Sequence, residues 1–360
     1  GSGLMFGMGG ATKYSIYRGQ KEDNNANKVF STTIYLVTVF AIIFMLIGIF
    51  FSEKLTLLLN ADKDVFHMTK TYLQIILLFA PAFMLNDTLL CFVRNDGNPK
   101  LSMISMLTGS FSNIILDYIF IFPLNMGIFG AVLATGLAPI ISLIILSRHL
   151  LTKQNQFHFI QLKLSFRLIR IIVSLGISSF ITEMASGTVI IVFNTIILHL
   201  QGNIGVAAYG VVANLSLVVI SIYTGIAQGT QPILSRVYGC NDIKSQKQIL
   251  NYAIKTLLLI SFLIYLTFLL IANPIVSVFN KEQNIQLQEI AVTGLKLYFT
   301  AIPFAGFNIV ISTYFASTEK ALSAQMISLL RGFFIIIPMA FFMSFLLKMT
   351  GVWLSFPITE

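Results

Sequence analysis

The sequence predicts an all-α integral membrane protein built from two related lobes, and three observations support this. Hydrophobic residues make up 56% of the 360-residue chain, charged residues only 10%, and mean hydropathy is +0.85. Soluble domains carry about 25% charged residues. The apolar residues fall into runs long enough for a helix to cross a bilayer. Finally, part of the chain recurs in the same order about 220 residues later.

The repeat links residues spread over most of the chain, at offsets of 220 to 223. The matched pairs are Gly19 and Gly239, Pro81 and Pro303, Phe92 and Phe315, and the segments Met103–Leu107 (MISML) and Met326–Leu330 (MISLL). Because the order is the same in both copies, the repeat is a parallel duplication. Several secondary transporters use such a duplication to build two similar bundles around a central pathway.

The apolar runs predict nine full spans and two partial ones. The full spans are 29–51, 71–93, 101–122, 127–147, 168–200, 204–235, 249–272, 286–317 and 322–347, and the partial ones are 1–17 and 351–360. Several runs exceed the roughly 20 residues that a spanning helix needs. We therefore expect those helices to tilt or to extend into water.

The repeat also divides the chain. We predict an N-terminal lobe at 1–152, a cytoplasmic inter-lobe loop at 153–167 and a C-terminal lobe at 168–360. Comparing the two copies predicts a fragment of a twelve-helix protein, without the first helix, half of the second and the end of the last. The glycine-rich run 3–11 predicts a small-residue helix face that packs closely on a neighbour.

The net charge of +9 reflects membrane topology rather than nucleic-acid binding. If the loop 18–28 is cytoplasmic, the loops on its side carry fourteen Lys and Arg residues and the opposite loops five. This asymmetry is the positive-inside bias. We therefore expect a multi-pass protein of the bacterial plasma (inner) membrane, with the lipid bilayer as a partner and no nucleic acid.

Asp117 is the most informative ionisable residue within a predicted span. Asn113 lies four residues earlier on the same helical face, among Ile, Leu and Phe residues. An amide and a carboxyl group in such a setting suit a proton or a cation, and intramembrane carboxylates are functional by default. The alternative is an inter-helix hydrogen bond that only stabilises packing.

Other polar residues within spans leave two interpretations open. Asp87 and Arg94, seven residues apart on one face, predict either a local charge pair or gate, or a structural helix end. Glu183 predicts either the wall of a wet cavity or contact with cytoplasmic water. Asn194, Gln228 and Gln231 predict contacts between helices or with a ligand.

The remaining side chains suggest simpler roles. Lys13, Lys255, Lys296 and Arg331 lie near expected helix ends, where long side chains reach the interface. The two cysteines have no disulfide or metal-ligand spacing. His149 and His158 fall in the loop that follows the predicted span 127–147, which leaves no catalytic histidine in mid-membrane and argues against an enzyme.

Five motifs together resemble the MATE (multidrug and toxic compound extrusion) transporters, and most closely the bacterial MepA-like subgroup. They are GMGGATxxSxxxG at 7–19, RxxGNP at 94–99, NxxxDxxF at 113–120, GxxGAxxAT at 127–135, and QGTQP at 228–232 followed by Tyr238 and Gly239.

This resemblance implies a twelve-helix antiporter with two six-helix lobes. It would act as a monomer, exporting small organic cations in exchange for protons or sodium ions with no other cofactor. In the family, an aspartate on the first helix forms a cation site with an Asn and an Asp on the fifth, which Asn113 and Asp117 match. Some members also use acids on the seventh and tenth helices. Glu183 lies on the seventh, but span 286–317 has no acid near its middle, which favours coupling in the N-terminal lobe.

Two alternatives belong to other functional classes. A lipid-linked oligosaccharide or polysaccharide flippase shares the duplicated architecture, but it predicts a cavity rich in Arg and Lys. A polytopic membrane enzyme needs a catalytic histidine or paired carboxylates in mid-membrane. The sequence shows few mid-span cations and no such pair. Both alternatives are therefore less well supported than efflux.

Overall fold

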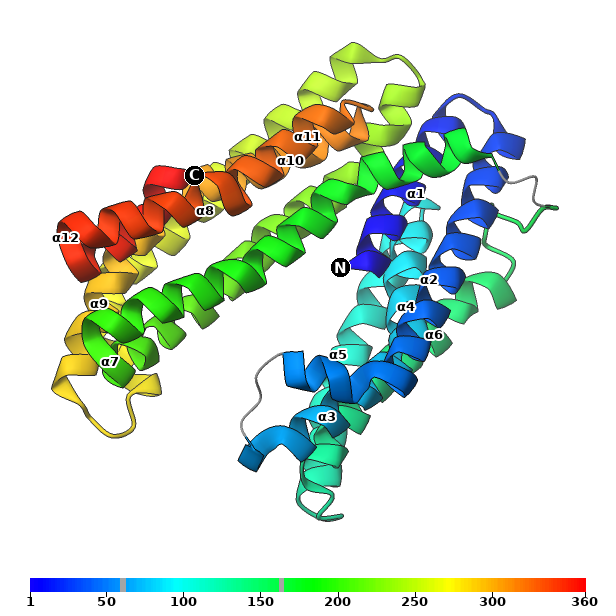
Figure 1. Cartoon of the computed structure of the whole chain (residues 1–360). Coiled ribbons are helices and arrows are strands. Elements are labelled where there is room, and N and C mark those ends of the chain that lie inside the picture. Colours follow the sequence, from blue (N-terminus) through cyan, green and yellow to red (C-terminus); the bar gives the residue numbers. More distant parts are fainter. Residues whose placement is uncertain (59–62, 162–164) are drawn as a thin grey trace. The chain divides into compact units, whose positions relative to one another are not determined.

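A computed structural model describes residues 1–58, 63–161 and 165–360, and every regular element among them is a helix (Figure 1). The chain forms two compact units, Gly1–Gly176 and Ile177–Glu360, each described here by itself. The division falls within α7 (Phe166–Gly239). Residues 162–164 of the predicted inter-lobe loop lie outside the described residues.

The first unit contains six helices and the beginning of α7. They are α1 (Ser2–Gly19), α2 (Asp23–Leu58), α3 (Lys63–Leu78), α4 (Ala80–Asn95), α5 (Pro99–Ile121) and α6 (Gly127–Leu151). The predicted spans 29–51, 101–122 and 127–147 correspond to α2, α5 and α6. These three spans are confirmed as helices, although α2 and α6 extend several residues beyond the predicted ends.

The predicted span 71–93 is not one straight helix, because a bend of 48° separates α3 from α4. Phe79 lies at the break and Pro81 in the first turn of α4. Proline has no backbone N–H to donate to the carbonyl four residues earlier, and its ring crowds that carbonyl. The break is thus a local consequence of the proline.

The prediction of a small-residue face on α1 is confirmed. A Cβ atom on Gly3 would lie 2.7 Å from the Cα of Met84 in α4, and one on Gly9 only 2.0 Å from the carbonyl oxygen of Ile172 in α7. Real side chains do not tolerate such distances. Glycine therefore lets α1 approach its neighbours at backbone contact.

The second unit contains the rest of α7 and the elements that follow. They are α8 (Ile243–Phe279), α9 (Ile285–Tyr298), η1 (Phe299–Ala301), α10 (Ile302–Ser317), α11 (Ala321–Leu329), the π-helical turn η2 (Leu330–Phe334) and α12 (Ile336–Thr359). Gly202, at φ 63°, interrupts α7 between the predicted spans 168–200 and 204–235. Lys348, at φ 51°, interrupts α12 between the last two predicted spans.

The sequence repeat has a structural counterpart in the two units. Pro303 lies in the first turn of α10, directly after η1, as its match Pro81 lies in the first turn of α4. The corresponding span is therefore interrupted at the matched proline in both units. This agreement supports the parallel duplication inferred from sequence.

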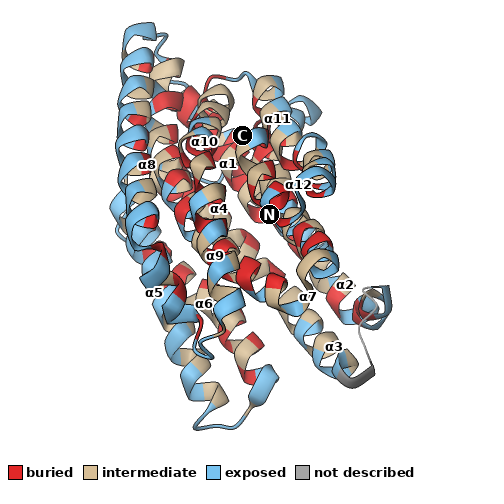
Figure 2. Ribbon diagram, turned by 90° about the vertical axis from the view of Figure 1, so that its left-hand side faces the viewer, coloured by how far each residue is buried: buried red, intermediate tan, exposed pale blue. Residues whose placement is uncertain are grey.

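The surface of each unit suits a lipid environment. Seven helices among the described residues are long and apolar enough to cross a membrane, or eight if the bent pair counts as one span. Figure 2 shows exposed positions along α5 and α8. There they include Phe111, Ile114, Phe262 and Leu263. Exposed apolar faces on spanning helices are what a bilayer requires, so the chain is a multi-pass membrane protein.

Candidate functional site

Close packing against α6 holds α5 in place. The Asn98 side chain caps α5 by accepting a hydrogen bond from the backbone N–H of Leu101 at 3.1 Å. The Ser105 hydroxyl donates to the carbonyl of Ser142 in α6 at 2.5 Å. A Cβ on Gly109 would lie 3.2 Å from the carbonyl oxygen of Ala138. This rigid contact immediately precedes the motif that carries Asn113 and Asp117.

Asn113 and Asp117 follow Gly109 at intervals of one turn, on one face of α5. Both residues are half-buried. The Nδ2 atom of Asn113 is buried and has no hydrogen-bond partner among the described residues. Within the same part of the chain, no hydrogen bond or ion pair engages the Asp117 carboxylate. An amide and a carboxylate thus share a face. The Asp117 oxygens can accept a proton or a cation, whereas the unpartnered Asn113 atom is a hydrogen-bond donor.

The second predicted pair in this unit lies on α4. The Asp87 carboxylate faces α1, since a Cβ on Gly3 would lie 3.0 Å from its Oδ2 atom. Arg94 is half-buried at the other end, where its Nη2 atom lies 3.8 Å from the sulfur of Cys91. A direct contact between Asp87 and Arg94 stays a prediction.

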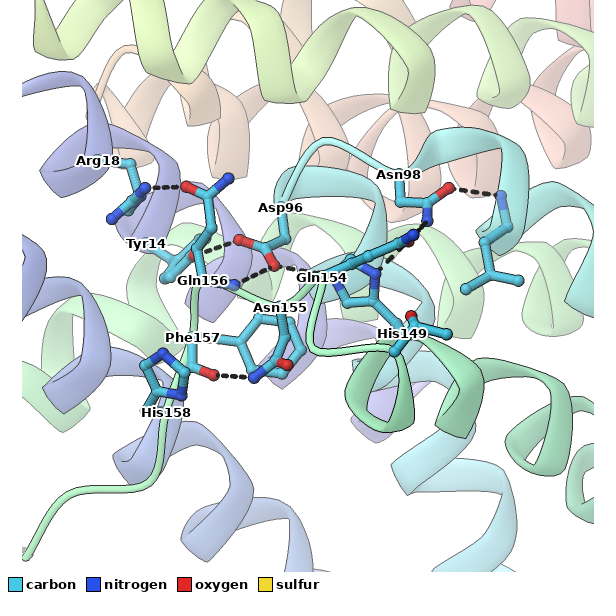
Figure 3. A network of polar contacts seen from close by, with 12 residues as sticks. Tyr14, Arg18, Asp96, Asn98, His149, Gln154, Asn155, Gln156, Phe157 and His158 are labelled. Atoms are coloured by element: carbon cyan, nitrogen blue, oxygen red, sulfur yellow. Dashed lines mark hydrogen bonds and ion pairs between the residues drawn. The ribbon is translucent and has the colours of Figure 1, made fainter.

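A buried carboxylate follows directly after this helix. Asp96 accepts hydrogen bonds from the Tyr14 hydroxyl at 2.5 Å, from Nε2 of His149 at 2.8 Å and from the backbone N–H of Gln156 at 2.8 Å (Figure 3). Its side chain is fully buried. Asn98 contacts the other ring nitrogen, Nδ1, of His149 at 3.5 Å. Asp96 therefore joins α1, the end of α6 and the loop that follows.

Sequence reasoning missed this network and misplaced one member. His149 was expected in the loop, but it lies in the last turn of α6 and is 2% exposed. The loop is attached to α2 as well, because Asn27 and Ser31 accept hydrogen bonds from the backbone N–H groups of His158 and Ile160. No sequence motif predicts these long-range contacts. The arrangement is structural, since every carboxylate oxygen of Asp96 is occupied.

The second unit holds its own buried carboxylate. Glu360 is 2% exposed and Arg331 14% exposed at the side chain, and the two form an ion pair. Nε of Arg331 donates to Oε1 of Glu360 at 3.1 Å, and Nδ2 of Asn308 donates to Oε2 at 2.9 Å. The expectation that Arg331 extends to the interface is wrong. Instead, Arg331 lies in the π-helical turn η2 and points to a partner inside the unit.

The same pair lines a partly open cavity in the second unit. The cavity measures about 90 Å³, and its walls include the aromatic side chains of Tyr209, Tyr298 and Phe356. Thr182 and Ser186, one turn apart on α7, add hydroxyl groups. This volume admits a few water molecules or a small group, but it is well below the roughly 300–1,000 Å³ of drug-sized sites.

The other predicted site residues of the second unit do not converge. Glu183 is exposed and Asn194 half-buried, and neither lines the cavity. Gln231 is 1% exposed and donates to the hydroxyl of Ser235 on its own helix at 3.3 Å. Gln228 is half-buried and lies one turn before Pro232 on α7. Both interpretations of Glu183, as the wall of a wet cavity or as a contact with cytoplasmic water, stay predictions.

The four lysine and arginine residues expected at helix ends behave in two ways. Lys255 and Lys296 are exposed, as predicted. Lys13 is 8% exposed, and its Nζ atom lies 4.3 Å from the centroid of the Tyr17 ring. Lys13 is thus buried rather than exposed, and a cation–π contact accounts for part of its environment. That it reaches the interface stays a prediction.

Comparisons with known proteins agree with this architecture. The MatE family model matches residues 2–119 and 176–342. The multidrug export protein MepA of Staphylococcus aureus (strain MSSA476) is 28% identical over the whole chain, which covers 79% of that protein. MepA of Staphylococcus saprophyticus subsp. saprophyticus is also 28% identical, with the same coverage.

Solved structures show the same fold. One described as "Crystal structure of MATE in complex with MaL6" has a TM-score of 0.93 at 19% identity, covering 99% of this chain and 81% of that one. The family match covers most of both units, and its first part includes Asn113 and Asp117. The chain belongs to the MatE family.

Proposed function

We propose that this protein exports cationic amphipathic compounds across the plasma membrane by antiport with protons or sodium ions. Membership of the MatE family and the multidrug export named for its MepA relatives support this function. The observation that carries the proposal is the half-buried Asp117, which accompanies Asn113 and has no partner among the described residues. We expect the monomer to be the transporting unit.

Asp117 would couple the two fluxes by holding one ion at a time. With Asp117 deprotonated and free of a cation, the first unit would accept a drug from the cytoplasm or inner leaflet. A proton or sodium ion arriving from outside would then neutralise the carboxylate, and rearrangement of the unit would release the drug outward. A charge that crosses 100 mV supplies about 2.3 kcal/mol, enough for a concentration ratio of about fiftyfold.

The second unit would contribute an aromatic surface to substrate binding. Tyr209 and Tyr298 line its small cavity, and aromatic faces attract organic cations. Because about 90 Å³ is too small for a whole drug molecule, we expect this cavity to hold one part of a substrate or water. The alternative function, flipping a lipid-linked oligosaccharide, needs cations for pyrophosphate. In this cavity Arg331 is already paired with Glu360, so the second unit offers little support for that function.

Ethidium efflux from energised cells tests the proposal. Cells that express the full-length chain should expel ethidium, and the Asp117→Asn variant should lose most of this efflux at equal membrane abundance. Glu282→Gln, a change in an exposed turn, serves as the matched control and should transport normally. A proton uncoupler compared with removal of sodium then identifies the ion. Efflux that survives unchanged in Asp117→Asn would exclude Asp117 from coupling.

A further inference from the structure

A cavity within the first unit lies away from Asp117, which is not among its lining residues. It measures about 790 Å³, and α1, the start of α2 and the start of α7 contribute to its walls. This volume falls within the range of small-molecule sites. Efflux as proposed above leaves the cavity without a role.

Three cations line this cavity. Lys13 belongs to α1, Lys28 to α2 and Arg167 to α7, and no described lining residue is acidic. Lys13 is the buried member, at 8% exposure, with its ammonium group over the ring of Tyr17, which also lines the cavity. Three positive charges from three helices around one ligand-sized space are the arrangement expected for a multiply oxygenated anion.

The carboxylates next to the lining residues in sequence have partners of their own. Asp23 forms an ion pair with Arg18, and Glu22 accepts a hydrogen bond from Nδ2 of Asn25 at 2.6 Å. Neither carboxylate lines the cavity. The cavity therefore keeps its positive character, with amide and hydroxyl groups from Asn24 and Thr32 as additional hydrogen-bonding partners.

The position of the cavity along the helices suits a lipid headgroup. Lys13 precedes the end of α1 at Gly19 by six residues, and Lys28 follows the start of α2 at Asp23 by five. At 1.5 Å per residue, both lie roughly 7–9 Å from the α1–α2 turn. The headgroup layer on each side of a bilayer is about 5–8 Å thick. Long basic side chains at this depth reach the layer, on the side that the positive-inside bias makes cytoplasmic.

We propose that this cavity binds the phosphate group of an anionic ligand, with the headgroup of an anionic phospholipid of the cytoplasmic leaflet as its natural occupant. Lys13 and Arg167 donate charge-assisted hydrogen bonds to the phosphate oxygens, and Lys28 adds a third positive charge. Basic pockets between membrane helices on the cytoplasmic side are the recognised form of such sites. The site is separate from the ion-coupling carboxylate, so it does not depend on the proposed transport cycle.

Ligand titration of the purified full-length chain in a non-ionic detergent tests the inference. The probes are dioctanoyl phosphatidylglycerol, dioctanoyl phosphatidylcholine and inorganic phosphate, and native mass spectrometry measures binding. We expect phosphatidylglycerol to bind more tightly than phosphatidylcholine. Lys13→Met and Arg167→Gln should each weaken it about tenfold, the effect of losing one charge-assisted hydrogen bond. Lys100→Gln, an exposed lysine outside the cavity, is the control and should bind as the wild type does.

The remaining outcomes also decide the question. If Lys13→Met fails to fold, the Arg167→Gln variant still tests the site, because Arg167 is exposed. Inorganic phosphate that competes with the lipid and loses affinity in the same variants would support the phosphate site and add a soluble source. Equal binding by the wild type and both variants, or equal weakening in Lys100→Gln, would overturn the proposal.

Discussion

In the first unit, Asp117 lies half-buried on α5 beside Asn113, and no described residue forms a hydrogen bond or ion pair with it. In the second unit, Glu360 is buried between Arg331 and Asn308, and both of its oxygens are engaged. A carboxylate with a fixed cation at its side offers no vacancy for an exchangeable ion. Burial of a carboxylate therefore does not identify a coupling site, whereas an available carboxylate does.

The duplication makes this difference sharper. The position 223 residues after Asp117 is Ala340, a fully buried residue of α12. The second unit thus repeats the scaffold without repeating the carboxylate at that position. Glu360 comes from the end of the same helix and pairs with η2 and α10 instead. We expect the two carboxylates to serve coupling and structure, respectively.

The largest effect should come from breaking the structural pair. Arg331→Met leaves the Glu360 carboxylate buried without its cation, and removing one partner of a buried pair costs about 3–5 kcal/mol. The free energy of unfolding, or the melting temperature in detergent, measures this loss. The double variant Arg331→Met/Glu360→Met should recover most of it, because no buried charge remains. A double variant as unstable as the single one would contradict a purely structural role.

A second carboxylate of the first unit sharpens the comparison. Both carboxylate oxygens of Asp96 accept hydrogen bonds, as those of Glu360 do. Asp96→Asn should therefore lower the free energy of unfolding. The Asn amide has one acceptor oxygen, but its NH2 group would face a residue that donates to the carboxylate. The mismatch should cost about 1–3 kcal/mol of stability. Limited trypsin digestion should show faster cleavage after Lys153, in the loop that Asp96 holds through Gln156. Asp23→Asn is the matched control, since that side chain is 67% exposed. Equal cleavage in both variants would refute the anchoring role.

The smallest effect concerns an exposed carboxylate. Asp242 caps α8, and its hydrogen bonds from the hydroxyl and backbone N–H of Ser245 lower its pKa below the ordinary 3.8. The pKa of Asp242 is lower in the folded protein than in the unfolded chain. The cap therefore stabilises fully at a pH above the unfolded-chain pKa, and this stabilisation is lost as the pH falls through the folded-state pKa. Hydrogen exchange of the first turn of α8 should accelerate over that acid range. Asp242→Asn should lose this pH dependence. If the pH dependence persists in the variant, another group causes it.

The sequence was sufficient for the features that depend on local composition. Hydropathy placed the spans, and the helix breaks at Gly202 and Lys348 fall between spans that were predicted separately. The glycine face of α1 was predicted from residues 3–11 and meets α4 and α7. Pro81 lies inside the predicted span 71–93, where a proline can bend a helix, and the break at Phe79 directly precedes its turn.

The long-range polar contacts could not be predicted from the sequence. Tyr14 and Asp96 are 82 residues apart, and Arg331 and Glu360 are 29 apart. No periodicity joins such residues, because their partners are set by how separate helices pack. Lys13 and Arg331 were assigned to the interface by a rule for isolated helices. Packing overrode that rule at Arg331, which is paired inside its unit, whereas Lys13 is buried but lies within reach of the helix end. The motif with Asn113 and Asp117 was found because its two residues share one helix.

The most direct test of the central claim compares the two carboxylates in one assay. Full-length wild type, Asp117→Asn and the Arg331→Met/Glu360→Met double variant would be reconstituted into liposomes, and drug-induced proton or sodium movement would be recorded alongside drug flux. Coupling at Asp117 predicts that the double variant keeps the ion-to-drug ratio of the wild type, while Asp117→Asn shows no drug-induced ion movement. Ion movement that persists in Asp117→Asn and disappears in the double variant would contradict the account.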